Sequence, residues 1–315
     1  SASKSRCTAF VGLKSKASFV QRAPFAPSRS PRQSHTSEYA LAVSCFGRRE
    51  TGSFEIETKA KHIVWKRKMY KKGIYTVTAN EPLTPSVWRM TLEGDTQYLT
   101  RPGQFVNIEV EGLYLRRPIS VCDYDERTLT LIYKVVGEGT ARLSEMKAGV
   151  KLDLLTGLGN GFDPDAECRR PLLVGGGVGV PPLYNLAKKL IDKGRKVTVV
   201  LGFNTASEVF YEEEFRALSA EVFVTTADGT HGTKGFVTTA IAEKKPDFDY
   251  FYACGPLPML RALSDATGDI PGELSFEERM GCGFGGCMGC SCQTKNGAKR
   301  ICKEGPVLKK EEIIW

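Results

Sequence analysis

A glycine-rich segment of the 315-residue sequence holds five of its ten cysteines, between Cys282 and Cys302. Cys282, Cys287 and Cys290 follow the spacing C-x4-C-x2-C, which is typical of a [2Fe–2S] loop whose fourth cysteine lies further along the chain. The glycines between them let the backbone wrap an inorganic cluster and direct N–H groups at its sulfurs. The segment therefore predicts an iron–sulfur module.

A [2Fe–2S] cluster takes four thiolates, so one of the five cysteines is spare. Cys302 is the remaining cysteine far enough along the chain to close the site from the opposite side, which leaves Cys292 over. Because Cys292 lies only two residues after Cys290, an alternative in which it replaces Cys290 stays open. Zinc is disfavoured, since a zinc ribbon prefers two CxxC pairs or histidines, and all three histidines lie outside this segment.

From Met69 to about residue 168 the sequence is typical of short strands separated by turn residues. Several runs alternate apolar and polar residues, as half-buried strands do, and only 140–149 has helical spacing. Repeated short strands predict a small antiparallel β barrel. The first strand is expected to open at Met69, and the others at 103–110, 117–122, 129–136 and 151–157.

After Pro171 the pattern changes to continuous apolar strands that alternate with helices. This alternation predicts an α/β domain in which helices cover both faces of a parallel sheet. The expected strands are 172–177, 196–203, 221–228 and 249–256. The expected helices are 181–194, 207–219, 235–245 and 257–268. The expected domains are a barrel at 69–168, an α/β domain at 169–270 and a cluster module at 271–315.

Residues 1–68 differ from the rest in composition. They carry 14 Lys and Arg against 4 Glu, whereas the remaining residues carry 30 Lys and Arg against 32 acids. The near-neutral remainder argues against a nucleic-acid partner. We expect 1–68 to be a disordered leader or a misassigned start, with a Ser/Arg-rich transit peptide as the alternative. No apolar run is long enough to span a membrane, and the clustered cysteines suggest a reducing compartment, the cytoplasm.

Two glycine-containing motifs fall where the carboxyl ends of parallel strands are expected. The first, GGGVGVPPL at 175–183, lies between a strand and a helix, where backbone N–H groups can face a pyrophosphate. It departs from GxGxxG because Val180 occupies the sixth position. The second, ACGP at 253–256, ends the fourth strand. Together they predict a dinucleotide site with the candidate residues Gly175, Gly176, Gly177, Gly179, Cys254, Gly255 and Pro256.

Two interpretations of Cys254 are open: it makes a polar contact near the nicotinamide, or it is a buried structural thiol. NADH is expected to be preferred to NADPH, because 201–209 contains no Arg or Lys to meet a 2′-phosphate. The acid that usually binds the ribose 2′-hydroxyl is missing at the start of that span.

Two further motifs lie in the expected barrel, RRPISV at 116–121 and VGEGT at 136–140. With the glycine loops and the cysteines, their order is similar to that of the electron transfer subunit family of NAD-dependent dihydroorotate dehydrogenase, in the ferredoxin reductase-like group. The resemblance covers about residues 70–315. It implies an FAD barrel, an NAD domain and a [2Fe–2S] module that deliver electrons from an FMN-containing catalytic subunit to NAD⁺, in a heterotetramer of two plus two.

The resemblance also implies residue roles. The first FAD motif is matched by Arg117, Pro118, Ile119 and Ser120. The strand along the flavin is matched by Ile132, Tyr133 and Lys134, and the pyrophosphate loop is matched by Gly139 and Thr140. Cys282, Cys287, Cys290 and Cys302 match the cluster ligands. No Ser–His or carboxylate pair is present, as expected where cofactors perform the chemistry. The alternatives are a reductase subunit of a sulfide, sulfite, hydrogenase or bifurcating transhydrogenase complex, and a zinc-dependent binding module on a flavin-like barrel.

Overall fold

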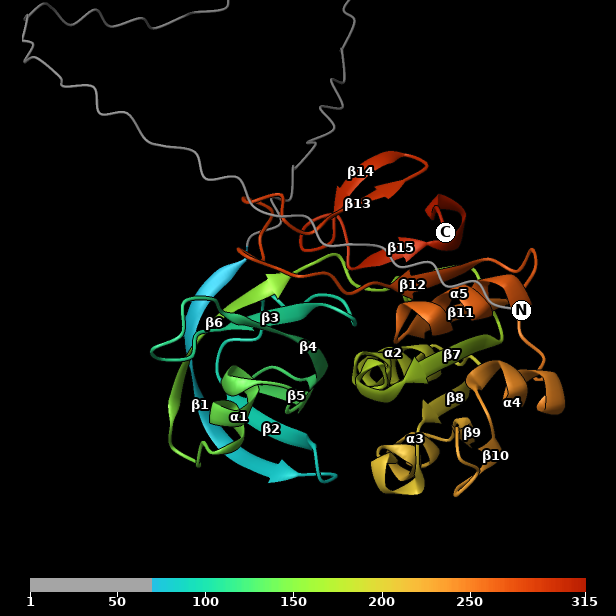
Figure 1. The fold of residues 1–315 in the computed structure, drawn as a ribbon, viewed down its shortest axis with the longest axis horizontal. Coiled ribbons are helices and arrows are strands. Elements are labelled where there is room, and N and C mark those ends of the chain that lie inside the picture. The colour runs from blue at the N-terminus through green and yellow to red at the C-terminus, as the bar shows by residue number, and fades with distance from the viewer. Residues whose placement is uncertain (1–69) are drawn as a thin grey trace, which may run out of the picture. The chain divides into compact units, whose positions relative to one another are not determined.

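A computed structural model describes residues 70–315, and the expectations for 1–68 lie outside this range. The first part is a closed barrel of six antiparallel strands in the order β1-β2-β5-β4-β3-β6 (Figure 1). Its interior is filled by apolar side chains such as Val77, Met90 and Leu131, each 0% exposed. The strands are β1 (Lys71–Pro82), β2 (Val87–Glu93), β3 (Phe105–Ile108), β4 (Arg117–Tyr124), β5 (Thr128–Lys134) and β6 (Lys151–Leu158).

The expected barrel is confirmed, with two differences in its elements. Strand β2 was missed by sequence patterning. The helix expected at 140–149 is α1 (Glu138–Ser144), which begins earlier because Thr140 closes its first turn. The hydroxyl of Thr140 accepts hydrogen bonds from the backbone N–H groups of Val136 and Gly137 and donates one to the carbonyl of Gly137.

The second part is a seven-stranded sheet in the order β10-β9-β8-β7-β11-β12-β15. All neighbouring strands run parallel except β15, which runs antiparallel to β12 at the edge. The strands are β7 (Pro171–Gly176), β8 (Thr198–Phe203), β9 (Glu221–Thr226), β10 (Thr233–Lys234), β11 (Tyr250–Cys254), β12 (Gly272–Ser275) and β15 (Val307–Lys309). The four expected strands are β7, β8, β9 and β11.

Helices cover both faces of this sheet, as expected, because side chains alternate along each buried strand. Leu173 and Val199 point to one face and pack with α2 and α3. Val174 and Val200 point to the other face and pack with α4 and α5. The helices are α2 (Pro181–Asp192), α3 (Glu212–Ala217), α4 (Val237–Lys244) and α5 (Leu257–Ala266).

The helix expected at 207–219 is wrong in its first half. A short 3-10 turn, η2 (Ala206–Glu208), precedes α3, and Tyr211 between them has a φ of 66°. A non-glycine residue in this left-handed region cannot continue a helix, so α3 begins only at Glu212.

The last part of the chain is built onto the sheet. Strands β12 and β15 belong to the seven-stranded sheet, and only the hairpin β13 (Ser291–Thr294) with β14 (Gly297–Arg300) forms a sheet of its own. Cys290 and Cys302 are buried in the same apolar cluster as Leu274 of β12 and Leu308 of β15. The cysteine segment therefore packs against the edge of the sheet.

Candidate cofactor sites

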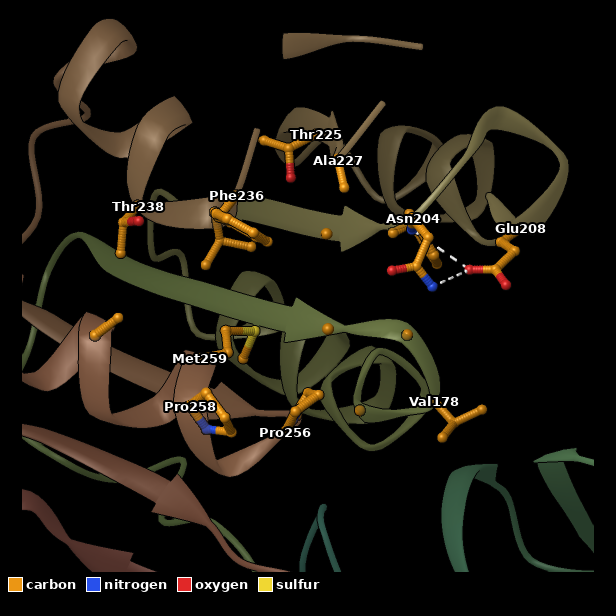
Figure 2. Close-up of a pocket in the computed structure, with 18 of the residues that line it drawn as sticks. Val178, Asn204, Glu208, Thr225, Ala227, Phe236, Thr238, Pro256, Pro258 and Met259 are labelled. Carbon is orange, nitrogen blue, oxygen red and sulfur yellow. Dashed lines mark hydrogen bonds between the residues drawn. The ribbon is translucent and has the colours of Figure 1, made fainter. Parts of the chain in front are cut away.

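A pocket of about 630 Å³ lies at the carboxyl ends of β7, β8, β9 and β11 (Figure 2). This is the edge at which open parallel sheets bind their ligands. Five of the predicted nucleotide residues line it, namely Gly176, Gly177, Gly179, Gly255 and Pro256. Gly175 and Cys254 lie beneath them at the ends of β7 and β11, where they are paired with each other across the strands.

Gly179 is required by close packing between the two glycine motifs. A Cβ atom at Gly179 would lie 2.2 Å from the carbonyl oxygen of Cys254, far inside van der Waals contact. Gly177 is required for a different reason: its φ is 53° and a Cβ atom there would meet nothing within 4 Å. The loop therefore folds tightly over the end of β11 and leaves its backbone open to the pocket.

Cys254 is 3% exposed, and its side chain belongs to the apolar cluster on the α2 face of the sheet. Burial raises the pKa of this thiol to about 12, so it is neutral at physiological pH. The placement agrees with the interpretation of Cys254 as a buried structural thiol.

Two charged side chains in the pocket were not recognised as a pair from the sequence. Glu208 accepts a hydrogen bond of 2.7 Å from the Asn204 side-chain amide at the end of β8, as Figure 2 shows. Its other carboxylate oxygen lies 3.8 Å from Nζ of Lys134, which comes from β5 of the barrel. The 3-10 turn η2 brings Glu208 back to the strand end, where the sequence showed no acid.

The expected FAD residues lie together on the barrel. Gly139, at the start of α1, packs directly on the Arg117 side chain of β4, because a Cβ atom at Gly139 would lie 1.9 Å from Arg117 Nε. The Arg117 guanidinium also donates to the carbonyl of Leu115. Around this pair, Tyr114, Leu115 and Val136 are exposed apolar residues. A glycine contact beneath an uncovered apolar rim fits a flat, partly apolar cofactor such as FAD.

The side chains of the other expected flavin residues point in different directions. In β4, Pro118 is exposed, whereas Ile119 and Ser120 are half-buried. In β5, Tyr133 points into the barrel, where its hydroxyl donates to the Asn80 side chain. Ile132 belongs to the apolar cluster outside the barrel, and Lys134 follows on the same side of the strand. Tyr133 can therefore offer a flavin only its backbone.

The four expected cluster cysteines lie as two pairs. Sγ of Cys290 lies 3.2 Å from Sγ of Cys302, and both residues are buried. Sγ of Cys282 accepts hydrogen bonds from the backbone N–H groups of Gly286, at 3.1 Å, and Cys287, at 3.4 Å. Each iron of a [2Fe–2S] cluster takes two of the four protein thiolates, so this pairing fits a cluster with two irons.

The cluster loop favours a thiolate at Cys282. Burial by itself raises the pKa of this thiol, but hydrogen bonds from the backbone of Phe284 and Cys287 outweigh it and lower the pKa to about 6. Among residues 70–315, no three Cys, His, Asp or Glu side chains converge as ligands of one ion would. The expected ligands of the cluster are therefore the thiolates of the two cysteine pairs.

Cys292 packs against the apolar cluster that contains Cys290 and Cys302, but it belongs to neither pair. It is a half-buried residue of β13 and faces Lys299 of β14 across the hairpin. Burial and the nearby Glu278 carboxylate raise the pKa of its thiol. That Cys292 is the spare cysteine stays a prediction.

Comparison with known proteins identifies the family. Residues 277–314 match the iron–sulfur cluster binding domain of dihydroorotate dehydrogenase B, and residues 173–265 match the oxidoreductase NAD-binding domain. The chain is 48% identical over 257 residues to the dihydroorotate dehydrogenase B (NAD(+)) electron transfer subunit of Geobacillus sp. (strain WCH70), covering 78% of this chain and 100% of that protein. The subunit from Bacillus pumilus (strain SAFR-032) is 46% identical, covering 77% and 98%. The chain belongs to this family of electron transfer subunits.

Solved structures of other reductases have the same fold. An NADH-dependent reduced ferredoxin-NADP oxidoreductase is 30% identical, with a TM-score of 0.70 over 77% of this chain and 90% of that one. A ferredoxin reductase of carbazole 1,9a-dioxygenase is 25% identical, with a TM-score of 0.55 over 63% and 66%. The barrel and the parallel sheet are thus a ferredoxin reductase-like fold.

As an electron transfer subunit of an NAD-dependent dihydroorotate dehydrogenase, the chain uses FAD, a [2Fe–2S] cluster and NAD, and it works with a catalytic subunit. In residues 70–315, no helix is both long and apolar enough to cross a membrane.

Proposed function

We propose that the chain passes electrons from an FMN-containing catalytic subunit through its [2Fe–2S] cluster and FAD to NAD⁺. One relationship carries the proposal: the barrel touches both other sites. Lys134 of β5 lines the nucleotide pocket, and the side-chain amide of Asn107 on β3 donates to the carbonyl of Cys282 at 3.3 Å. A barrel that holds FAD between a nucleotide pocket and a cluster loop supports the order cluster, flavin, nucleotide.

The cofactors supply the redox chemistry when they are bound, and the side chains hold them in place. In this proposal the backbone of Gly176, Gly177 and Gly179 faces the nucleotide pyrophosphate. Arg117 and the Gly139–Thr140 turn hold the flavin's phosphates and ring edge. The cysteine pairs 282/287 and 290/302 would hold the cluster's irons. Arg117 supports this role because a guanidinium presents a planar fork of hydrogen-bond donors that is suited to a phosphate.

We further propose an assembly of two electron transfer and two catalytic subunits. Exposed apolar side chains on the cluster loop support docking of a partner beside the cluster. Phe284 is 39% exposed and stacks on Tyr70, with ring centroids 5.3 Å apart, and Met288 is 56% exposed. Cytoplasmic placement is supported by the eight described cysteines, all free thiols, as in a reducing compartment.

The test is co-purification from the native host, followed by an assay of dihydroorotate-dependent NAD⁺ reduction. We expect an FMN-containing subunit to be recovered in equal amount, and the assembled complex to reduce NAD⁺ with dihydroorotate. The matched control is the complex with Cys290→Ser, which should keep FAD and lose this activity. A complex that contains a different partner and responds only to that partner's substrate would contradict the proposal.

A further inference from the structure

Two asparagines of the barrel hold the cluster-binding segment, one near each end. Asn107 lies on β3 and reaches Cys282, the first expected ligand. Asn160 follows β6 and reaches Glu304–Val307, just after Cys302, the last expected ligand. No motif in the sequence singled out either residue.

Asn160 is fully occupied in this role. Its backbone N–H donates to the carbonyl of Gly305 at 2.6 Å, and its side-chain Nδ2 donates to the carbonyls of Glu304 and Val307 at 3.1 and 2.7 Å. Its Oδ1 accepts from the N–H of Val307 at 3.1 Å. Such a set of bonds is that of a structural clamp, because every polar atom of the side chain is paired.

Asn107 is different. It is 1% exposed, its Nδ2 donates a single bond to the Cys282 carbonyl, and its Oδ1 has no hydrogen-bond partner. A buried acceptor without a partner costs stability, so an apolar residue would suit a purely structural interface better. Stability alone therefore does not explain an asparagine at this contact.

The cluster loop is shaped to receive Asn107. Gly283 has a φ of 79°, and a Cβ atom there would lie 2.5 Å from Asn107 Nδ2. The amide thus packs directly on the backbone next to Cys282. On its other side, Asn107 pairs with Pro118 of β4, within the expected FAD motif Arg117–Ser120. One residue therefore touches the cluster loop and belongs to the strand beside the flavin motif.

We propose that Asn107 is a positioning residue for electron transfer between the cluster and FAD. It fixes the Cys282 side of the cluster relative to the flavin strand, and so sets the separation and orientation across which single electrons pass, one carrier being oxidised as the other is reduced. The inference rests on the proposed assignment of Arg117–Ser120 to FAD and of Cys282 to the cluster. Electron transfer slows steeply as the gap between carriers widens, so a loosened loop would slow this step.

The test compares Asn107→Ala with a matched control, Asn185→Ala, in the full-length protein carrying its cofactors. Asn185 of α2 is also buried, at 4% exposure, and also has an unpaired Oδ1. Its Nδ2 donates to Asp123 of β4 at 2.7 Å, away from the cysteine segment. A loss of stability common to buried asparagines should therefore appear in both variants.

We expect Asn107→Ala to keep FAD and iron and to accept electrons from NADH into the flavin at the wild-type rate. Transfer from flavin to cluster, followed by stopped-flow absorbance, should slow by about 10-fold, the lower end of the effects seen when outer contacts of a metal site are removed. The electron paramagnetic resonance spectrum of the reduced cluster should also shift or broaden. Asn185→Ala should change neither the spectrum nor the transfer from flavin to cluster.

Asn107→Leu provides a second variant of similar shape that removes the unpaired acceptor. It should unfold at or above the wild-type temperature, yet show the same slow transfer and altered spectrum. Wild-type transfer and spectrum in both Asn107 variants, or equal slowing in Asn185→Ala, would overturn the proposal. The transfer rate and the spectrum are both measured without the catalytic subunit, so a failure of this proposal can be distinguished from a failure of the proposed function.

Discussion

Nζ of Lys134 lies 3.8 Å from a carboxylate oxygen of Glu208, and this ion pair joins the barrel to the sheet at the nucleotide pocket. A pyrophosphate that entered the pocket would compete with Glu208 for Lys134, because Lys134 is the one basic residue among the described residues that line it. Glu208 therefore restrains Lys134 before the nucleotide binds.

The first prediction follows from this restraint. Glu208→Gln should lower KM for NADH by up to about fivefold, since a half-exposed pair is worth about 0.2–1 kcal/mol. Lys134→Ala should raise it. Steady-state kinetics with an artificial electron acceptor measure both. A higher KM in Glu208→Gln would mean that the carboxylate itself contacts the nucleotide.

Nucleotide preference is the second prediction. The wild-type kcat/KM for NADH should exceed that for NADPH by at least about tenfold, the ratio that 1.4 kcal/mol of repulsion produces. Glu208 lies in the pocket, and Asp228 follows the pocket residue Ala227 at the end of β9. Hydrogen bonds from Thr230 keep the pKa of Asp228 low, so it is charged. Asp228→Asn should lower the ratio of kcat/KM for NADH to that for NADPH. Comparable kcat/KM values for the two nucleotides in the wild-type protein would refute the preference.

The third prediction concerns the spare cysteine. Cys292→Ser should keep wild-type iron content and visible absorption of the [2Fe–2S] cluster, because Cys292 lies on the hairpin strand. Cys290→Ser should lose or shift both, because Cys290 is 3.2 Å from Cys302 in a buried pair. FAD should remain bound in each variant, since the residues expected to bind FAD lie on the barrel strands β4 and β5 and at the start of α1, and neither cysteine belongs to these elements. Iron loss confined to Cys292→Ser would reverse the assignment.

Glycine substitutions provide the fourth prediction. Gly179→Ala should destabilise the sheet and abolish nucleotide binding, because its Cβ atom would overlap the Cys254 carbonyl. Gly177→Ala has open space and should cost only about 1–2 kcal/mol for the left-handed backbone. Thermal unfolding and NADH titration compare the two. Equal effects would contradict the packing argument, because only Gly177 of the two has a left-handed backbone.

The fifth prediction is a pH dependence at Glu273. Burial raises the pKa of this carboxyl to about 7, although it accepts a bond from the N–H of Asp163. The folded protein then binds more protons than the unfolded chain between about pH 4.5 and 7, so this group lowers stability as the pH rises through that window. Glu273→Gln should be more stable than wild type at pH 8, with the difference vanishing near pH 4, in urea unfolding. A constant difference would exclude this titration.

Sequence patterning predicted the parts of the fold whose signals are local. Strands β7, β8, β9 and β11 are continuous apolar runs, and α2 has clean helical spacing from Pro181 to Asp192. Strand β15 could not be found in this way, because its three residues gain a strand conformation only by pairing with β12. Tyr211, with its left-handed backbone, interrupts a segment whose composition favours a helix.

The candidate sites show the same division. Cysteine spacing and glycine motifs predicted residues that the structure brings together at the nucleotide pocket and in the cysteine segment. Glu208 and Asn107 were missed because each acts through a contact distant in sequence, with Lys134 and Cys282 respectively. The direction of the Tyr133 side chain could not be predicted from the sequence either, since it depends on which face of β5 lies inside the barrel.

The edge strand β15 has a consequence for the order in which the protein matures. The ribosome synthesises all four expected cluster ligands before it reaches Val307–Lys309, which complete the nucleotide-binding sheet. Until then β12 has an unpaired edge, and such an edge invites pairing with other chains. If iron bound to a nascent chain before β15 was made, the sheet against which the cysteine segment packs would still be incomplete. We therefore expect the cluster to assemble after β15 has been translated.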